Sequence, residues 1–177
     1  MIFISDHNEE GQSMAWGTFG VAHFATLVFA VVLNVALYFI LKKCSQKVQV
    51  TVLGILSFWG IAAIIYNLFP LESALEYLPL HLCSFNAMVL PFAVITRNKV
   101  LGNLTLLWSF GAAMPLILNH SIADTAIGGS VFCFYYFPHV FEASIPIILF
   151  KLGLCKLDAR CIFSTVGISA AVYTAVH

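Results

Sequence analysis

The chain has 177 residues, of which 61% are hydrophobic and only 9% are charged, and its mean hydropathy is +0.97. Soluble domains carry roughly 25% charged residues, so the surface of this protein must face lipid rather than water. The net charge is zero, which gives no basis for a nucleic-acid partner. Five cysteines without a CxxC pair exclude a complete disulfide framework and give no support to a zinc ribbon. The composition predicts an all-α, polytopic membrane protein.

The N-terminal tail does not resemble a cleavable signal peptide. Its first seventeen residues contain Asp6, Glu9 and Glu10 and no Lys or Arg, whereas a secretory signal begins with a basic region. We therefore interpret the first long apolar segment as a retained membrane anchor.

Six apolar segments follow one another along the chain. A membrane-spanning helix needs about 20 mostly apolar residues, and the segments cover about 18–41, 48–69, 77–95, 100–119, 131–150 and 162–177. The sixth has only about 16 residues before the end of the chain, so we expect either a short helix or a truncated form of a longer protein, and favour truncation. The linkers are short and no internal repeat is found, which predicts a single domain over 1–177.

The basic residues alternate between loops. All eight follow the first, third or fifth segment: Lys42, Lys43, Lys47, Arg97, Lys99, Lys151, Lys156 and Arg160. The other loops carry only acidic charge, at Glu72, Glu76 and Asp124. Basic loops stay in the cytoplasm, so we predict a multi-pass protein of the cell membrane with an extracytoplasmic N-terminus.

Ionisable side chains inside a membrane are costly and are candidates for function by default. They are His23, His81, Cys83, His120, His139 and Glu142, and the spans also contain Asn34, Asn67, Asn86 and Asn103. At 1.5 Å per residue, three of the histidines lie roughly 6 to 12 Å in from the outer ends of their helices, and Glu142 lies near the midplane. We therefore predict one polar pocket in the outer half of the bilayer.

The fifth segment carries the most informative pattern. Tyr135, His139 and Glu142 are spaced i, i+4 and i+7 and share one stripe of a helix. Glu142 could accept a proton from one imidazole nitrogen of His139 and so fix its tautomer. Pro138 and Pro146 each remove a backbone N–H and kink the helix. The alternative is a hydrogen-bonded pair that only holds helices together.

The third segment opens with LPLHLC. His81 and Cys83 would lie about 200° apart around a regular helix, so they point to one spot only if the backbone is irregular there. A pairing of Cys83 with His139 across helices is easier. Alone, a free cysteine usually behaves as a small buried hydrophobe. We predict His81, Cys83, His139 and Glu142 as catalytic residues.

We assign a substrate-binding role to three more residues: His23, Tyr135 and Asn86. For His23, which stands alone in AHFATL, a hydrogen bond between helices is an equal alternative.

Three phrases resemble a known family. FGVAHFATLVF, LPLHLCSF and FYYFPHVF are similar to bacterial YwaF-type integral membrane proteins, and LPLHLCSF is the most specific of them. A metazoan branch is regarded as acyltransferases that remodel phospholipids with a cysteine and a histidine. The resemblance implies that His81 and His139 are the matching histidines. In that branch the cysteine directly precedes the first histidine, whereas Leu80 holds this position here and Cys83 lies beyond it. The family also has further C-terminal sequence, which agrees with truncation.

The leading hypothesis is an intramembrane lipid acyltransferase or acyl hydrolase acting on a phospholipid or fatty-acyl substrate, with no cofactor. His139 would act as general base, Cys83 or an acceptor hydroxyl as nucleophile, and His81 as a group that polarises the acyl carbonyl. A proton-coupled transporter with Glu142 and His139 in its pathway is the first alternative. A metal site or a structural membrane subunit are the others; the HxC spacing of His81 and Cys83 is a weak metal signal, and we predict no metal ligand.

Overall fold

The computed structural model describes residues 17–68, 81–118 and 129–176. In the described part of the chain the elements are, in order, α1 (Val21–Lys42), α2 (Gln46–Leu68), α3 (Leu82–Thr96), α4 (Lys99–Leu118), α5 (Gly129–Val131), η2 (Phe132–Tyr136), α6 (Phe137–Lys151), η3 (Ala159–Cys161) and α7 (Ile162–Val176). All of them are helical. Helices satisfy their own backbone hydrogen bonds, which lipid cannot do.

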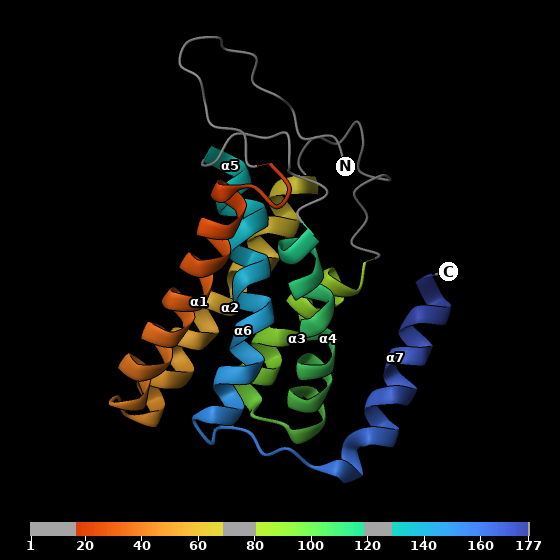
Figure 1. Cartoon of the computed structure of the whole chain (residues 1–177). Coiled ribbons are helices and arrows are strands. Elements are labelled where there is room, and N and C mark those ends of the chain that lie inside the picture. Colours follow the sequence, from red (N-terminus) through yellow and green to blue (C-terminus); the bar gives the residue numbers. More distant parts are fainter. Residues whose placement is uncertain (1–16, 69–80, 119–128, 177) are drawn as a thin grey trace.

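The helices lie side by side in a bundle with α6 at its centre (Figure 1). α6 contacts α1, α2, α3 and α4. Among the described residues, four continuous helical stretches are long and apolar enough to cross a membrane: α1, α2, α4 and Gly129–Lys151, which joins α5, η2 and α6. α3 is a shorter apolar helix of 15 residues. The protein is therefore an all-α, multi-pass membrane protein, as predicted.

The helices begin and end within a few residues of the six apolar segments. The largest difference is at the third segment, where α3 begins at Leu82 rather than at 77. His81 precedes the helix in an extended conformation, with φ −96° and ψ 150°. The expected helical residues 77–80, and the expected ends at 69 and 119, lie outside the described residues.

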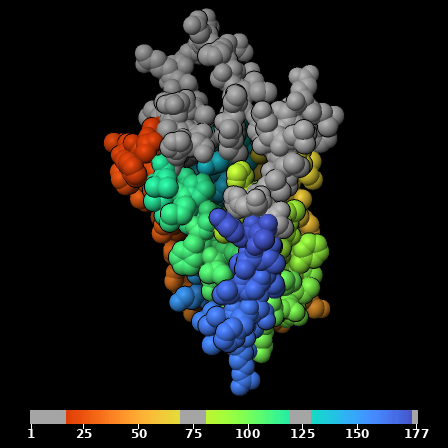
Figure 2. Space-filling model, turned by 90° about the vertical axis from the view of Figure 1, so that its right-hand side faces the viewer, coloured from red at the N-terminus to blue at the C-terminus, as the bar shows by residue number. Residues whose placement is uncertain are grey.

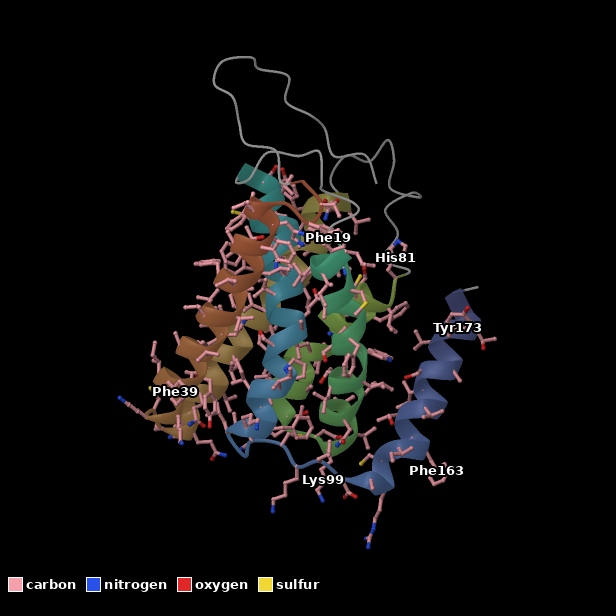
Figure 3. All side chains as sticks on the ribbon, viewed as in Figure 1. Phe19, Phe39, His81, Lys99, Phe163 and Tyr173 are labelled. Carbon is pink, nitrogen blue, oxygen red and sulfur yellow. The ribbon has the colours of Figure 1, made fainter. Side chains whose placement is uncertain are left out.

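All eight cationic side chains lie at one end of the bundle. They are at the end of α1, the start of α2, the turn between α3 and α4, and the segment after α6. Figure 3 shows Lys99 at this end and His81 at the opposite end. Lys99 forms an ion pair with Asp158 at 3.6 Å, and Asn103 donates a hydrogen bond to the Lys156 carbonyl. We call this the basic end.

The fifth span contains a π-helical turn. The Phe137 N–H donates to the Phe132 carbonyl, five residues back. The next residue is Pro138, which has no N–H to continue this pattern to Cys133. The indole N–H of Trp59 on α2 donates to the Cys133 carbonyl instead, at 2.8 Å. The proline thus makes an irregular turn, and a neighbouring helix supplies the missing donor.

α7 runs along the outer side of α4 (Figure 2). The indole N–H of Trp108 on α4 donates to the Ser169 hydroxyl at 2.9 Å. Most other side chains of α7 whose exposure is described are exposed. All five cysteines of the chain are in the described part, and all are free.

Candidate functional site

A cavity of about 610 Å³ lies between α2, α3, α4 and the fifth span. Its lining residues include five of the seven predicted site residues: His81, Cys83, Tyr135, His139 and Glu142. The remaining lining residues are mostly small or apolar, and the polar exceptions are Asn67 and Ser84. Residues from helices distant in sequence therefore meet in one cavity, but His23, which the polar pattern placed in the same pocket, does not line it.

His81 and Cys83 both line this cavity because the backbone is irregular at that point. His81 is the residue before α3 and is extended, while Cys83 is in the first turn of the helix. The separation of about 200° that a regular helix would give His81 and Cys83 therefore does not apply. His81 is exposed and Cys83 is partly buried, so His81 lies at the rim and Cys83 lies deeper.

One nitrogen of His139 is held by the backbone. The Nδ1 atom lies 2.7 Å from the Tyr135 carbonyl oxygen. A carbonyl only accepts, so Nδ1 carries the proton and donates. Nε2 is then the unprotonated nitrogen of the neutral ring and can accept a proton. The Tyr135 ring also packs on the imidazole, with centroids 4.5 Å apart.

The orienting group for His139 differs from the one expected. The sequence pattern predicts the Glu142 carboxylate, whereas the structure places the Tyr135 carbonyl there. Both partners are on the same helical stripe. The carbonyl four residues back is closer, because an imidazole in a helix leans toward the preceding turn.

Glu142 is deeply buried where three helices meet. It is 4% exposed, and within the described residues its Oε2 atom has no hydrogen-bond partner. Its Oε1 atom lies against Gly60 of α2: a Cβ added to this glycine would be 2.9 Å from Oε1 and 2.8 Å from the Ala87 Cβ. The absence of a side chain at Gly60 is therefore what gives the carboxyl its space.

Two predicted site residues do not line the cavity. Asn86 is fully buried and its side-chain N–H donates to the Glu142 carbonyl at 3.4 Å, and among the described residues its Oδ1 atom has no partner. His23 is 1% exposed, its Nε2 lies 2.7 Å from the Leu116 carbonyl, and its Nδ1 accepts from the Phe19 N–H. The substrate-binding roles of both stay predictions, and His120 lies outside the described residues.

Metal binding has no structural support in the described part of the chain. No group of three or more His, Cys, Asp or Glu side chains there is close enough together to hold a metal ion. Side chains can line the same cavity without being close enough together to bind one metal ion.

Sequence reasoning missed the small residues that shape the cavity. Gly60, Ala63, Ala87 and Gly111 all line it. A Cβ at Gly111 would be 3.3 Å from a methyl group of Leu82. Small residues allow close approach of helices in membranes. The glycines and alanines on α2, α3 and α4 could therefore have indicated in the sequence where these helices pack together.

The chain was compared with known proteins. No curated protein and no solved structure shows a significant match. The model of the TMEM164 family matches residues 18–177, which includes every residue of the cavity. The chain therefore belongs to the TMEM164 family.

Proposed function

We propose that this protein is a membrane enzyme that transfers or hydrolyses a lipid acyl group in the cavity between α2, α3, α4 and the fifth span. The single observation that carries this proposal is the convergence of Cys83 and His139 on one cavity, with His139 held in the tautomer that leaves Nε2 free to accept a proton. The similarity of LPLHLCSF to the YwaF-type proteins and their acyltransferase branch supports it.

The covalent route uses Cys83 as nucleophile. His139 Nε2 takes the thiol proton, and the sulfur attacks the ester carbonyl carbon. The bond from this carbon to the alcohol oxygen breaks, and the protonated imidazole returns the proton to the leaving alkoxide. The acyl group is then a thioester on Cys83. An acceptor hydroxyl, or water, attacks the thioester and regenerates the thiol.

The direct route needs no acyl-enzyme. The acceptor hydroxyl gives its proton to His139 Nε2 and attacks the lipid ester itself. His81, at the rim, would donate a hydrogen bond to the developing oxyanion in either route. The two routes make different predictions for Cys83 and the same prediction for His139.

The test is intact-protein mass spectrometry after incubation with a phospholipid mixture. Wild type is compared with Cys83→Ser and with Cys133→Ser, a matched control because Cys133 is exposed and does not line the cavity. A hydroxylamine-sensitive acyl adduct that only Cys83→Ser lacks supports the covalent route. Lipid turnover without an adduct supports the direct route. If the protein forms no adduct and turns over no lipid, the enzyme proposal is refuted.

A proton-coupled carrier is the second candidate, and the burial of Glu142 favours it. A carboxyl group that is 4% exposed and has an oxygen without a partner among the described residues is costly to charge. Such groups in membranes often relay protons. Solute uptake into proteoliposomes that is driven by a pH gradient and lost in Glu142→Gln would support this candidate.

The gathered cations support a cytoplasmic location for the basic end, and we propose that this end faces the cytoplasm of a cell-membrane protein. The proposal puts His81 and the cavity on the extracytoplasmic side. Cys44, directly after α1 at the basic end, gives a test. In a Cys133→Ser background, which removes the exposed cysteine near the opposite end of the bundle, a membrane-impermeant maleimide should label Cys44 only in permeabilised cells, with Cys44→Ser as the control. Equal labelling without permeabilisation would reverse the orientation.

A further inference from the structure

A second hollow lies between α1, α4 and α6. It is a groove of about 790 Å³, distinct from the cavity, with which it shares no lining residue. Its wall is formed by aliphatic and aromatic side chains such as Leu27, Val31, Phe110 and Ile147.

The polar side chains in the mid-membrane part of this wall are satisfied internally. The Ser144 hydroxyl on α6 is 2.7 Å from the side-chain carbonyl oxygen of Asn34 on α1 and 2.7 Å from the Val140 carbonyl. The Asn34 amide N–H donates to the Ala30 carbonyl at 2.8 Å. Ser109 on α4 donates to a carbonyl of its own helix. A hydrocarbon chain in the groove would therefore break none of these hydrogen bonds.

The groove is longer than the hydrocarbon layer of one lipid leaflet. On α1 its lining residues extend from Leu27 to Phe39, which is about 18 Å along a helix. Half of a bilayer's hydrocarbon core is about 15 Å. On α4 the lining residues reach Leu116 and Ile117 in the last turn, so the groove begins at the basic end, extends past the bilayer midplane and can hold the full length of one acyl chain.

One end of the groove carries a positive charge. Of the described residues that line it, Lys151 alone is charged. It is the last residue of α6, at the basic end, and is exposed. An acyl chain that follows the groove from this end therefore places its headgroup beside an ammonium group. A lipid phosphate is the anion expected at this depth.

We propose that this groove is a binding site for one anionic glycerophospholipid of the leaflet at the basic end, with an acyl chain between α1, α4 and α6 and its phosphate at Lys151. The site is on the other side of α6 from the cavity: at 3.6 residues per turn, Ser144 and Lys151 lie roughly 120° or more around the helix from His139 and Glu142. The proposal does not depend on the acyl-transfer proposal.

Native mass spectrometry of the protein released from nanodiscs tests the proposal. The nanodiscs contain phosphatidylcholine with a minor fraction of phosphatidylglycerol. Wild type should retain phosphatidylglycerol in excess of its bulk fraction. Lys151→Gln should bind it about fivefold more weakly, the factor that one lysine contributes near an anionic membrane surface. Lys156→Gln should bind it as wild type does, because Lys156 is exposed at the same end but does not line the groove.

A second variant separates the acyl chain from the charge. Ala143 lines the groove, and Ala143→Leu should displace the lipid while Lys151 is intact, with circular dichroism and thermal unfolding showing that the variant folds. Equal enrichment of both lipids on wild type would overturn the proposal. So would equal losses in the two lysine variants, which would indicate an unspecific charge effect, or full retention in folded Ala143→Leu. Acyl-transfer activity is not part of the readout, so the two proposals fail separately.

Discussion

The cavity and the groove lie on opposite sides of α4 and α6, and their polar side chains differ in how completely they are hydrogen-bonded. In the groove, Asn34 and Ser144 bond to each other and to the backbone. At the cavity, an oxygen of Glu142 has no partner among the described residues, and His139 keeps one nitrogen available. α6 therefore presents hydrogen-bonded polar side chains to the groove and incompletely bonded ones to the cavity.

This difference indicates where chemistry can occur. Buried polar atoms without partners cost stability, typically about 1 to 3 kcal/mol each, and in native proteins they are rare, with a catalytic role among their explanations. A wall whose polar side chains are hydrogen-bonded within the protein contributes packing but no reactive group. The cavity is therefore the side at which substitutions should change activity, and the groove the side at which they should change lipid binding or stability alone.

The largest expected effect is that of His139→Ala on turnover. Loss of a general base lowers the rate by about 10²- to 10⁴-fold. The variant should still fold, because the lost hydrogen bond to Tyr135 is within one helix. Release of acyl product from phospholipid in proteoliposomes measures the rate, and thermal unfolding is the control. Wild-type turnover by a folded His139→Ala protein would remove the chemical distinction between the cavity and the groove.

The next effect is on packing beside the carboxyl group. Gly60→Ala places a Cβ 2.8 Å from the Ala87 Cβ and 2.9 Å from Glu142 Oε1. Neither neighbour is the far end of a flexible surface chain, so the variant should lose about 1 to 3 kcal/mol, as overpacked cores do.

Gly54→Ala on the same helix is the matched control for Gly60→Ala. A Cβ there meets nothing within 4 Å, so the variant should gain up to about 1 kcal/mol from helix propensity. Thermal or denaturant unfolding in detergent measures both variants. Equal effects of the two substitutions would show that Glu142 is not confined by Gly60.

The helices could be predicted from the sequence because lipid imposes one requirement on each span. Runs of apolar residues and the alternation of basic loops depend only on local composition. The gathering of His81, Cys83, His139 and Glu142 could also be anticipated, because ionisable side chains are costly inside a membrane and therefore face one another or a polar cavity rather than lipid.

Other features depended on tertiary contacts that a pattern does not contain. The extended backbone at His81 brings it into the same cavity as Cys83, and helix periodicity predicted their separation. The Tyr135 carbonyl takes the place expected for the Glu142 carboxylate. This was not predicted, because a pattern of residue types does not show which backbone groups accept hydrogen bonds. The sequence analysis did not predict the groove, since its mostly apolar wall resembles any lipid-facing surface.

A smaller effect is expected at His23, where α1 meets the last turn of α4. The Leu116 carbonyl is among the final four carbonyls of α4, which lack helical partners, and His23 Nε2 supplies the hydrogen bond. His23→Leu should lose about 1 to 2 kcal/mol, and His23→Gln, which can still donate, should lose less. Unfolding in detergent measures both. A large loss of turnover in stable His23→Gln would instead support the substrate-binding role predicted for His23.

The smallest effect is expected in the groove wall, from Ser144→Ala. The substitution removes one hydroxyl and leaves the side-chain carbonyl oxygen of Asn34 without this donor. Hydrogen bonds between membrane helices average only about 0.6 kcal/mol, because the unfolded chain in the membrane also finds partners. The free energy of unfolding should therefore change by this amount, and acyl turnover should not change, because Ser144 points away from His139 and Glu142. A fall in turnover as large as that of His139→Ala would mean that α6 transmits changes from one wall to the other, and the two sides would then have to be treated as one site.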